Sequence, residues 1–365
     1  MPHGGAADYA ASMSFSPRAR VHLQNIVANW RTIASLVSQS EAGAVVKANA
    51  YGHGVAPVAR ALHAAGCKTF FVAYVDEGVE LRNAIGAEAT ILAFNGAEPG
   101  DADLIRTHQI TPVLNALPAI REWLKLSDTP SYAVHVDTGM NRLGVRMEDV
   151  PELEDLTASG PPVHVMSHLV DSDDRSRAIN AEQLARFKDA ASHFPHAHTS
   201  FANTGGCFMG QDYGFDIVRP GIGLYGGGPP LPDGIELKPG MTLEAPILTV
   251  QSVQPGETVG YGATYTFDTP RTLATVALGY GDGFLRAAGN KGIASLGGIV
   301  CPIVGRVSMD LITIDVTQAA DLAMPGAFAQ FIGAEILLEE QARRAGTVGY
   351  ELVTGLGHRV RRIYD

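Results

Sequence analysis

A single lysine interrupts an apolar run near the start of the chain. Residues 44–54 read AVVKANAYGHG, and Lys47 lies near the C-terminal end of the strand that this run predicts. Burial disfavours the charged ammonium and lowers the pKa of a lysine, so the amine can form a Schiff base with a carbonyl compound. A strand lysine taken alone is more often a solvated edge residue. Lys47 is therefore a candidate nucleophile whose surroundings must decide between the two interpretations.

The elements around Lys47 alternate between helix-like and strand-like stretches from about Arg18 to Gly228. The first predicted helix, residues 21–37, repeats apolar side chains at spacings of three and four. Eight short apolar runs follow, separated mostly by further helical stretches. This order predicts a parallel (β/α)8 barrel, with a doubly wound open sheet as the competing arrangement. In a barrel the reactive groups lie at the C-terminal ends of the strands, which is where Lys47 stands.

The pattern of predicted secondary structure changes after Gly226. The Gly/Pro-rich linker GGGPPLPDG is followed by short predicted strands with few helices, such as APILTVQSVQ and RTLATVALGY. We predict a mobile N-terminal tail over residues 1–17, a barrel domain over 18–235 and a mainly-β domain over 236–365. A first strand that residues before the barrel contribute to the β domain stays an open alternative.

Composition and charge exclude several classes of partner. The 365 residues carry a formal net charge of −11 and no Lys/Arg-rich run, which argues against nucleic acid and anionic membranes. No apolar run is long enough to span a bilayer, and the N-terminus lacks the positive start and apolar stretch of a signal peptide. Cys67, Cys207 and Cys301 have neither disulfide nor metal-site spacing. We therefore expect a cytoplasmic protein without a metal site.

The lysine motif AVVKANAYGHG closely resembles the cofactor-lysine signature of the alanine racemase family, the barrel-type (fold-type III) enzymes of pyridoxal 5'-phosphate (PLP). The resemblance continues in family order over nearly the whole chain, at HVDTGMNRLG, MSHL, ANTG, VRPGIGLYG, VGYGATY, GYGDG, PIVGRVSMD and GTVGYEL. It implies a PLP-dependent isomerase that interconverts L-alanine and D-alanine, as a homodimer with shared active sites. Whether such an enzyme serves D-alanine biosynthesis or catabolism is left open.

The resemblance assigns two bases to the reaction. Lys47 binds the cofactor and acts as one base, and Tyr261 of the VGYG motif, contributed by the partner subunit, acts as the other. Two bases on opposite faces of the substrate remove the need for one base to swing across. The family places His168 against this tyrosine and Arg219 behind the histidine. Arg219 faces the pyridine nitrogen, where its permanent proton leaves that nitrogen unprotonated and limits side reactions.

The remaining site residues are also implied by the resemblance. Phosphate binding falls to hydroxyl groups and to backbone N–H groups of a Gly-rich turn, a setting that suits anions. A small pocket beside the substrate would favour a methyl side chain. The implied cofactor-binding residues are Tyr51, Asn203, Thr204, Gly221, Ile222 and Tyr350. The implied substrate-binding residues are Arg142, Tyr280 and Met309 of the partner subunit, with Arg286 and Arg306 in the corridor that leads to the site.

Two positions depart from the common family pattern. His135 stands where the family commonly has a carbamylated lysine, and Ser308 stands where VGRVCMD is the common form. Histidine has no amine to carbamylate. We therefore hypothesise that Arg142 is held either by His135 as a neutral hydrogen-bond acceptor or by a bound anion such as chloride.

Three other functions share parts of this pattern. A serine or broad-specificity racemase would keep the same lysine, tyrosine and arginine. A non-catalytic PLP-binding protein with a similar barrel would lack the β domain and its tyrosine. A PLP decarboxylase would place an acidic group at the pyridine nitrogen instead of Arg219. Alanine racemase is the interpretation that accounts for all the motifs.

Overall fold

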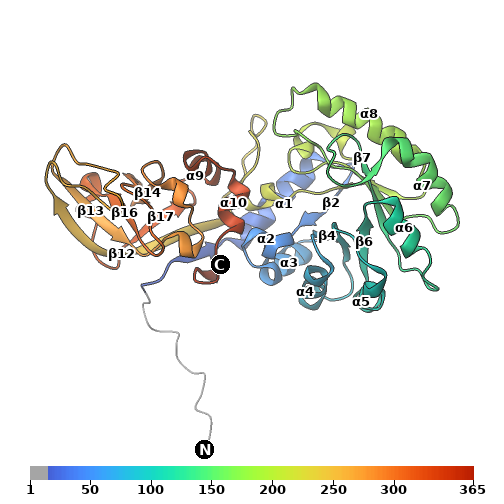
Figure 1. Cartoon of the computed structure of the whole chain (residues 1–365), viewed down its shortest axis with the longest axis horizontal. Helices are drawn as coiled ribbons and strands as arrows, with labels where there is room; N and C mark the ends of the chain where they lie inside the picture. The colour runs from blue at the N-terminus through green and yellow to red at the C-terminus, as the bar shows by residue number, and fades with distance from the viewer. Residues whose placement is uncertain (1–14) are drawn as a thin grey trace, which may run out of the picture. The chain divides into compact units, whose positions relative to one another are not determined.

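The computed structural model describes residues 15–365, so residues 1–14 of the predicted tail lie outside the described part of the chain. The chain divides into two compact units. The barrel unit comprises residues 21–241, 349–354 and 364–365, and the β unit comprises 15–20, 242–348 and 355–363. Figure 1 draws the barrel unit mainly in blue to green and the β unit mainly in orange. The limits of 18–235 and 236–365 for two domains stay a prediction.

Parallel strands form the wall of the barrel unit. The wall closes through one segment, in which Glu41 pairs with Ile217 and Ala44 pairs with Phe70 on the opposite side. Gly43 lies between these two positions, and its N–H donates to the carbonyl of Val218, the residue after Ile217, at 3.0 Å. The predicted (β/α)8 barrel is confirmed. Its strands are β2 (Glu41–Ala42), β3 (Ala44–Val45), β4 (Thr69–Val72), β5 (Thr90–Ala93), β6 (Ile110–Leu114), β7 (Ala133–Asp137), β9 (His164–Met166), β10 (His198–Ser200) and β11 (Ile217–Val218), with a short β8 (Val145–Arg146) beside β7.

The helices between these strands turn apolar faces toward the wall. In the first helix, Ile26 and Ile33 are buried, as the spacing of apolar residues predicts. The larger helices are α1 (Leu23–Leu36), α3 (Val55–Ala64), α4 (Val75–Ile85), α5 (Ala102–His108), α6 (Leu117–Trp123), α7 (Val150–Thr157) and α8 (Ala178–Ser192). Short helical turns are α2 (Lys47–Tyr51), α10 (Gly349–Thr354), η1 (Pro99–Asp101), η2 (Met147–Asp149), η3 (Gly206–Phe208), η4 (Gln211–Tyr213) and η5 (Ile222–Tyr225).

The barrel core is built from continuous apolar strands and aromatic side chains. All four residues of β4, TFFV, are buried, as expected for a parallel strand covered on both faces. Phe187 of α8 stacks on Phe201 with ring centroids 5.0 Å apart. Burying one such side chain stabilises the fold by about 1.5–3 kcal/mol, so these contacts hold the strand ends in place.

The β unit is built on a mainly antiparallel sheet and has one longer helix. Its longest strand, β12 (Met241–Val253), pairs with three neighbours and carries an irregularity between Ile247 and Thr249. β1, which precedes the barrel in the sequence, lies between β12 and β18 in this sheet. The other elements are β1 (Arg18–Val21), β13 (Arg271–Val276), β14 (Ile293–Leu296), β15 (Ile299–Pro302), β16 (Ile312–Asp315), β17 (Phe328–Ile332), β18 (Arg361–Tyr364), α9 (Leu338–Ala345), η6 (Tyr280–Asp282), η7 (Arg286–Ala288) and η8 (Thr317–Ala319).

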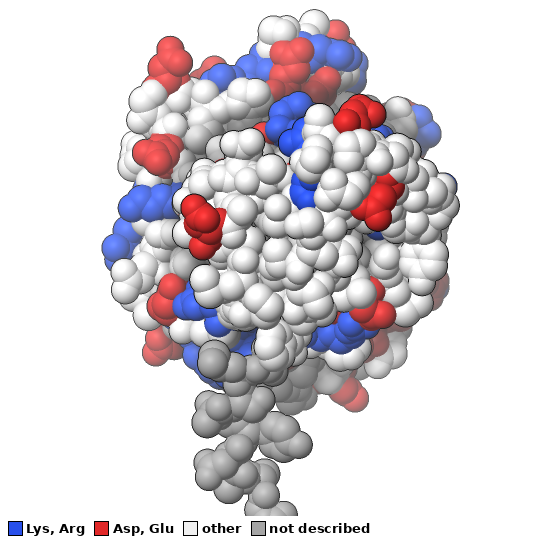
Figure 2. Space-filling model, turned by 90° about the vertical axis from the view of Figure 1, so that its left-hand side faces the viewer, with Lys and Arg blue, Asp and Glu red and all other residues white. Residues whose placement is uncertain are grey.

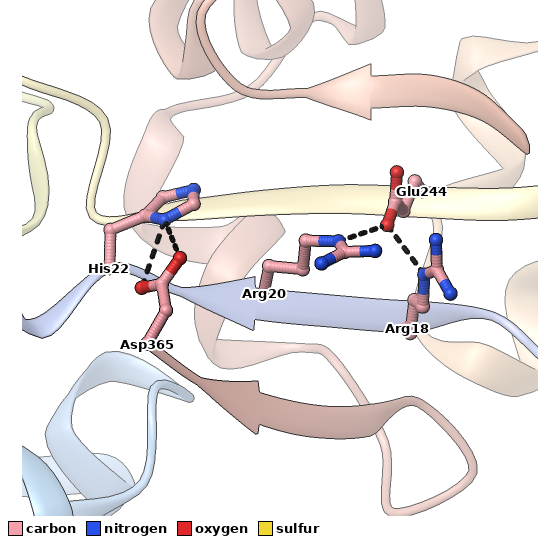
Figure 3. Close-up of polar contacts among 5 residues, drawn as sticks. All are labelled: Arg18, Arg20, His22, Glu244 and Asp365. Carbon is pink, nitrogen blue, oxygen red and sulfur yellow. Dashed lines mark hydrogen bonds and ion pairs between the residues drawn. The ribbon is translucent and has the colours of Figure 1, made fainter.

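Charged pairs lie along β1 and at the end of the chain (Figure 3). Glu244 of β12 accepts hydrogen bonds from Arg18 Nε at 2.5 Å and from Arg20 Nε at 2.6 Å. Its side chain is only 15% exposed, so the two guanidinium groups compensate a largely buried carboxylate. In the barrel unit, His22 Nδ1 lies 2.9 Å from Asp365 Oδ2. The first pair of contacts fastens the early strand β1 to a strand that follows the barrel.

Two negative observations apply to residues 15–365. None of their helices has the length and apolar character needed to cross a membrane. No group of three or more His, Cys, Asp or Glu side chains within this range could hold a metal ion.

Candidate active site

The barrel unit contains a cavity of about 600 Å³. This volume is in the usual range for a small-molecule site. The lining residues come from the segments that follow the C-terminal ends of several strands, the reactive end of a barrel. The cavity brings together ten of the residues predicted from the sequence: Lys47, Tyr51, Arg142, His168, Asn203, Thr204, Arg219, Gly221, Ile222 and Tyr350.

The turn that follows Lys47 has an unusual backbone. Ala48, Asn49, Ala50 and Tyr51 all have φ between 50° and 55°, which is the left-handed region. Only glycine adopts this region routinely, and other residues lose about 1–2 kcal/mol each there. Local hydrogen bonds hold the run, among them Ala50 N to the carbonyl of Val46 at 2.8 Å. Strain that surrounding contacts impose in this way is typical of functional sites.

The amine of Lys47 lies in a cationic setting. Burial lowers the pKa of Lys47, and the nearby charges of Arg142 and Arg219 lower it further, while Glu77 raises it. The Nζ atom lies 5.8 Å from the centroid of the Phe94 ring. A lowered pKa provides more of the neutral amine at a given pH, which is the form that attacks a carbonyl carbon.

A second part of the cavity is formed by glycine-rich backbone around Thr204. The Thr204 hydroxyl accepts hydrogen bonds from Gly221 N at 3.0 Å and from Gly223 N at 3.2 Å. A Cβ atom at Gly221 would lie 2.5 Å from the Tyr51 hydroxyl, so a side chain there would displace the phenol. Burial raises the pKa of Tyr51, which keeps its hydroxyl protonated as a donor. The ring of Tyr51 lies 6.0 Å from that of Tyr350, centroid to centroid.

Arg219 is a buried cation that pairs with neutral groups. Its guanidinium donates to Ser200 Oγ at 2.6 Å and to the carbonyls of Ser167 at 2.5 Å and Phe201 at 3.3 Å. No carboxylate among the described residues forms an ion pair with it. Burial lowers the pKa of Arg219 to about 10, so the side chain stays protonated at neutral pH. Its charge is therefore available to polarise whatever occupies the cavity.

Two histidines near Arg219 are neutral. Burial and the charge of Arg219 hold the pKa of His168 well below its usual value, and Arg219 NH2 lies 3.5 Å from His168 Nδ1. The pKa of His135 is lowered to about 4, mainly by burial and then by Arg219. Asn115 Nδ2 donates to two backbone carbonyls, so its Oδ1 is the atom that faces His135 Nδ1, at 3.2 Å. We assign the proton to Nδ1, which leaves Nε2 as an acceptor.

The sequence did not predict a polar network that lies behind His168. Gln183 of α8 is fully buried, and its Nε2 donates to Thr138 Oγ1 at 3.1 Å and to the carbonyl of His168 at 3.0 Å. Thr138 and Ser167 are joined through their hydroxyls at 2.8 Å. A glutamine among the apolar positions of a predicted helix is the signal that could have pointed to it, because buried amides need partners.

The β unit has its own pocket, of about 320 Å³, lined by Tyr261, Tyr280, Arg286, Arg306, Val307 and Ser308. Tyr261 lies in a turn in which Ala263 N donates to the carbonyl of Gly260 at 3.2 Å. Its side chain is 72% exposed, and its hydroxyl has no hydrogen-bond partner within residues 15–365. The described structure thus places the predicted second base and the two corridor arginines together, at a separate pocket from Lys47.

Tyr280 and Met309 lie side by side in the β unit. Tyr280 N donates to the carbonyl of Ser308 at 3.0 Å, and Gly281 N donates to the carbonyl of Met309 at 2.7 Å. A Cβ atom at Gly279 would lie 2.3 Å from that Met309 oxygen, which explains a glycine at this position. The two residues predicted to contact substrate are therefore held by one pair of backbone segments, and both side chains are partly exposed.

Comparison with known proteins gives one consistent family. The alanine racemase N-terminal domain matches residues 21–229, and the alanine racemase C-terminal domain matches residues 240–364. Alanine racemase from Methylobacterium nodulans is 43% identical over 97% of this chain and 97% of its own length. The catabolic alanine racemase of Agrobacterium fabrum is 42% identical over 92% of this chain and 89% of its own.

Solved structures agree with the sequence relatives. The alanine racemase of Bartonella henselae, with covalently bound PLP, superposes with a TM-score of 0.90 at 36% identity and covers 96% of this chain and 99% of its own. The biosynthetic alanine racemase of Pseudomonas aeruginosa has a TM-score of 0.90 at 33% identity, with the same coverage of both chains. These matches span both units and exceed what a shared fold alone requires. The chain belongs to the alanine racemase family of isomerase enzymes.

Proposed function

We propose that this protein interconverts L-alanine and D-alanine, with PLP attached to Lys47 and a second base supplied by Tyr261 of the partner subunit. One observation carries the proposal. A single cavity joins an amine of lowered pKa to a protonated, buried arginine and to the glycine-rich turn that Thr204 holds. The family membership supplies the reaction class that this combination serves.

The residues present fit PLP. The cavity lining carries three cationic side chains, Lys47, Arg142 and Arg219, and no carboxylate, which suits an anionic cofactor. Ile222 is the first residue of η5, and the N–H of such a residue has no partner inside its own helix. Together with the hydroxyls of Tyr51, Thr204 and Tyr350, it forms a donor set of the type that binds phosphate. Asn203 completes the proposed cofactor-binding residues.

When bound, PLP supplies an electron sink that makes the Cα proton of an amino acid removable. Lys47 then accepts a proton on one face of the substrate, and Tyr261 of the partner subunit returns one on the other. Each enantiomer meets a different base, and neither base has to cross the site. A tyrosine ordinarily titrates near pKa ~10, so the second base needs a neighbouring group that stabilises its anion. His168, backed by Arg219, fills this role.

Arg219 determines which PLP reaction is favoured. As a cation with a pKa of about 10, it would donate a hydrogen bond to the ring nitrogen of bound PLP and would keep its proton at neutral pH. An unprotonated ring nitrogen withdraws electrons less strongly, which limits transamination. A PLP decarboxylase would place an acidic group at the pyridine nitrogen. In this protein Arg219 is assigned to that position, and no carboxylate within residues 15–365 pairs with it, which argues against a decarboxylase.

Substrate binding falls to Arg142, Tyr280 and Met309 of the partner subunit. Tyr280 would leave room beside Cα for little more than a methyl group, which favours alanine. Arg142 has no hydrogen bond to another described side chain, and its charge contributes to the lowered pKa of His135. We infer that, in place of a carbamylated lysine, either His135 Nε2 as a neutral acceptor or a bound anion such as chloride holds Arg142.

We infer a homodimer from the exposure of the proposed second base. Tyr261 and Met309 are 72% and 53% exposed, an unusual state for residues that act on a substrate. Figure 2 shows a face of the molecule on which uncharged atoms predominate and charged side chains are sparse. A second copy that covers these side chains would complete both sites through two-fold symmetry. A cytoplasmic location stays a prediction from the sequence.

Chiral analysis in D₂O tests the proposal. Purified, PLP-loaded protein is incubated with L-alanine in D₂O. The two alanine enantiomers are then separated by chiral chromatography, and their masses are measured by mass spectrometry. D-Alanine with deuterium at Cα is the expected result, because the proton returned by the second base comes from solvent. L-Alanine recovered without deuterium would contradict the proposal. The same assay with serine, lysine and arginine separates an alanine racemase from a serine or broad-specificity racemase.

A further inference from the structure

We propose that Glu77 is a positioning residue for Lys47: its carboxylate joins the turn that carries the lysine to the segment that follows strand β4. Sequence reasoning assigned no role to this residue. The inference deepens the proposed function, on which its meaning for catalysis rests, but its geometry stands on the described contacts alone.

The two oxygens of Glu77 bind two separate segments. Oε1 accepts a hydrogen bond from Ala48 N at 2.7 Å, and Ala48 directly follows Lys47. Oε2 accepts from Ala73 N at 2.7 Å and from Tyr74 N at 3.3 Å, directly after β4. Hydrogen bonds to an ionised carboxylate are stronger than those between neutral groups. One side chain therefore fixes the position of the lysine backbone relative to the neighbouring strand.

Helix capping explains only part of this arrangement. Glu77 is the third residue of α4, and a glutamate there commonly bonds the backbone N–H at the start of its own helix. This accounts for the bond to Tyr74 N. It does not account for the bond to Ala48, which is 29 residues away in the sequence. Asp76 has the same charge in the same helical turn and forms no such bond among the described residues.

The left-handed turn makes the external bond important. Ala48 is the first residue of the run with positive φ, so its N–H precedes the hydrogen bonds that hold the turn internally. Glu77 satisfies this N–H and anchors the turn where it leaves Lys47. Without the carboxylate, the strained run would lose the contact nearest to the reactive amine.

Glu77 also acts on the charge of Lys47. Arg142 and Arg219 lower the pKa of Lys47, and burial lowers it most, whereas Glu77 is the one acidic group that raises it. His168 also faces Lys47, since the lysine contributes to its lowered pKa. Removing the negative charge of Glu77 must shift the lysine further toward its neutral form.

Competitive acylation of the cofactor-free protein measures this effect directly. The rate of acetylation of Lys47 by acetic anhydride is followed by mass spectrometry over a pH series, for the unchanged protein and for Glu77→Gln. We expect the inflection for Glu77→Gln to move to lower pH by about 0.5–1 unit, the usual spread of lysine pKa values in proteins. The matched control, Asp76→Asn, removes an equal charge from the same helical turn and should leave the inflection within about 0.2 units, because Asp76 does not contact the lysine turn.

The measurement has clear alternatives. An equal shift in both variants, or no shift in Glu77→Gln, would overturn the proposal. If Glu77→Gln does not fold, Glu77→Asp is measured instead, since it keeps the charge but withdraws it from Ala48. A smaller shift in the same direction is then expected, and an unchanged inflection overturns the proposal. The titration needs neither PLP nor alanine, so it can fail while the racemase assay succeeds, and the reverse.

Discussion

The two pockets of this protein hold their reactive groups in opposite ways. In the barrel unit, Lys47 lines a cavity, and hydrogen bonds hold both the backbone next to it and the guanidinium of Arg219. In the β unit, Tyr261 stands in an open turn and is 72% exposed. In the barrel unit, burial lowers the pKa of Lys47 most, and the charges of Arg142 and Arg219 lower it further. The β unit presents a phenol, and we propose that a group outside this unit activates it.

This difference teaches where catalytic control resides. A base whose pKa is set within one unit can be prepared before substrate arrives. Under the proposed function, the exposed Tyr261 would act as a base only when another surface covers it, which would link activity to assembly.

Removal of the lysine should abolish the reaction. Lys47→Ala is expected to lower kcat for alanine racemisation by more than about 10⁴-fold, because general-base catalysis alone contributes about 10²–10⁴ and cofactor attachment is lost as well. Chiral chromatography measures the rate, and borohydride reduction followed by mass spectrometry measures attachment. Lys68→Ala, at an exposed lysine, is the control and should retain both. Covalent PLP on Lys47→Ala would contradict the assignment.

The activity lost on substitution of Tyr261 should be partly restored in mixed dimers. Tyr261→Phe is expected to lose about 10²–10⁴-fold in rate, while Tyr265→Phe, in the same turn region, should stay active. Mixing the Tyr261→Phe chain with the Lys47→Ala chain under conditions of subunit exchange should restore about a quarter of the native activity. Half of the dimers are then mixed, and each has one intact site of two. Mixed dimers that form and remain inactive would show that the bases come from one chain.

Acid should destabilise the barrel unit. His135 and His164 have their pKa lowered to about 4, so the folded state prefers neutral imidazole. Their contribution to stability is complete above the unfolded value of about 6.5 and is lost as the pH falls toward 4. We expect the melting temperature of the cofactor-free protein to fall across this window. His135→Gln should reduce that fall by roughly 2–4 °C, the effect of about 1 kcal/mol.

The exposed His196 provides the matched control for this measurement. His196→Gln should leave the acid-induced fall unchanged, and an equal reduction in both variants would contradict the interpretation. The same His135 hypothesis predicts that bicarbonate does not change the racemisation rate, because there is no lysine amine at this position to carbamylate. A bicarbonate-dependent rate would remove His135 as the partner of Arg142.

The smallest effect is expected in the glycine-rich cradle. Thr204→Ala removes the hydroxyl that accepts hydrogen bonds from Gly221 N and Gly223 N. The same hydroxyl is a proposed phosphate donor, and the loss of that one hydrogen bond, about 1 kcal/mol, corresponds to roughly fivefold weaker PLP binding. Fluorescence titration of the cofactor-free protein measures the dissociation constant. Thr157→Ala, a buried threonine in α7, should change it little, and a similar loss there would indicate a general loss of structure.

Sequence patterns predicted the barrel and the placement of Lys47 well, because both follow from periodic burial. Apolar runs that alternate with helical stretches define the strands, and residues just after strand ends must meet at one end of a barrel. His168, Asn203 and Arg219 follow this rule. Tyr350 does not, since it lies far along the chain and reaches the cavity through α10, and only the family motif indicated it.

The supporting residues could not be predicted in the same way. Glu77, Asn115 and Gln183 each act through one to three hydrogen bonds to residues 13–45 positions away, which leave no periodic trace in the sequence. The left-handed turn is equally hidden, because alanine and tyrosine do not favour positive φ. Such features depend on the surrounding tertiary structure, and local sequence preferences do not predict them.

The return of residues 349–354 to the barrel unit has a consequence for synthesis. A ribosome that has completed residue 241 must still translate residues 242–348 before Tyr350 and α10 exist. At about 5–20 residues per second, the nascent barrel waits roughly 5–20 seconds without them. During this interval Tyr51 lacks one of its aromatic neighbours and the cavity lacks part of its wall. The order of translation therefore delays a complete cofactor site until nearly the whole chain has been made.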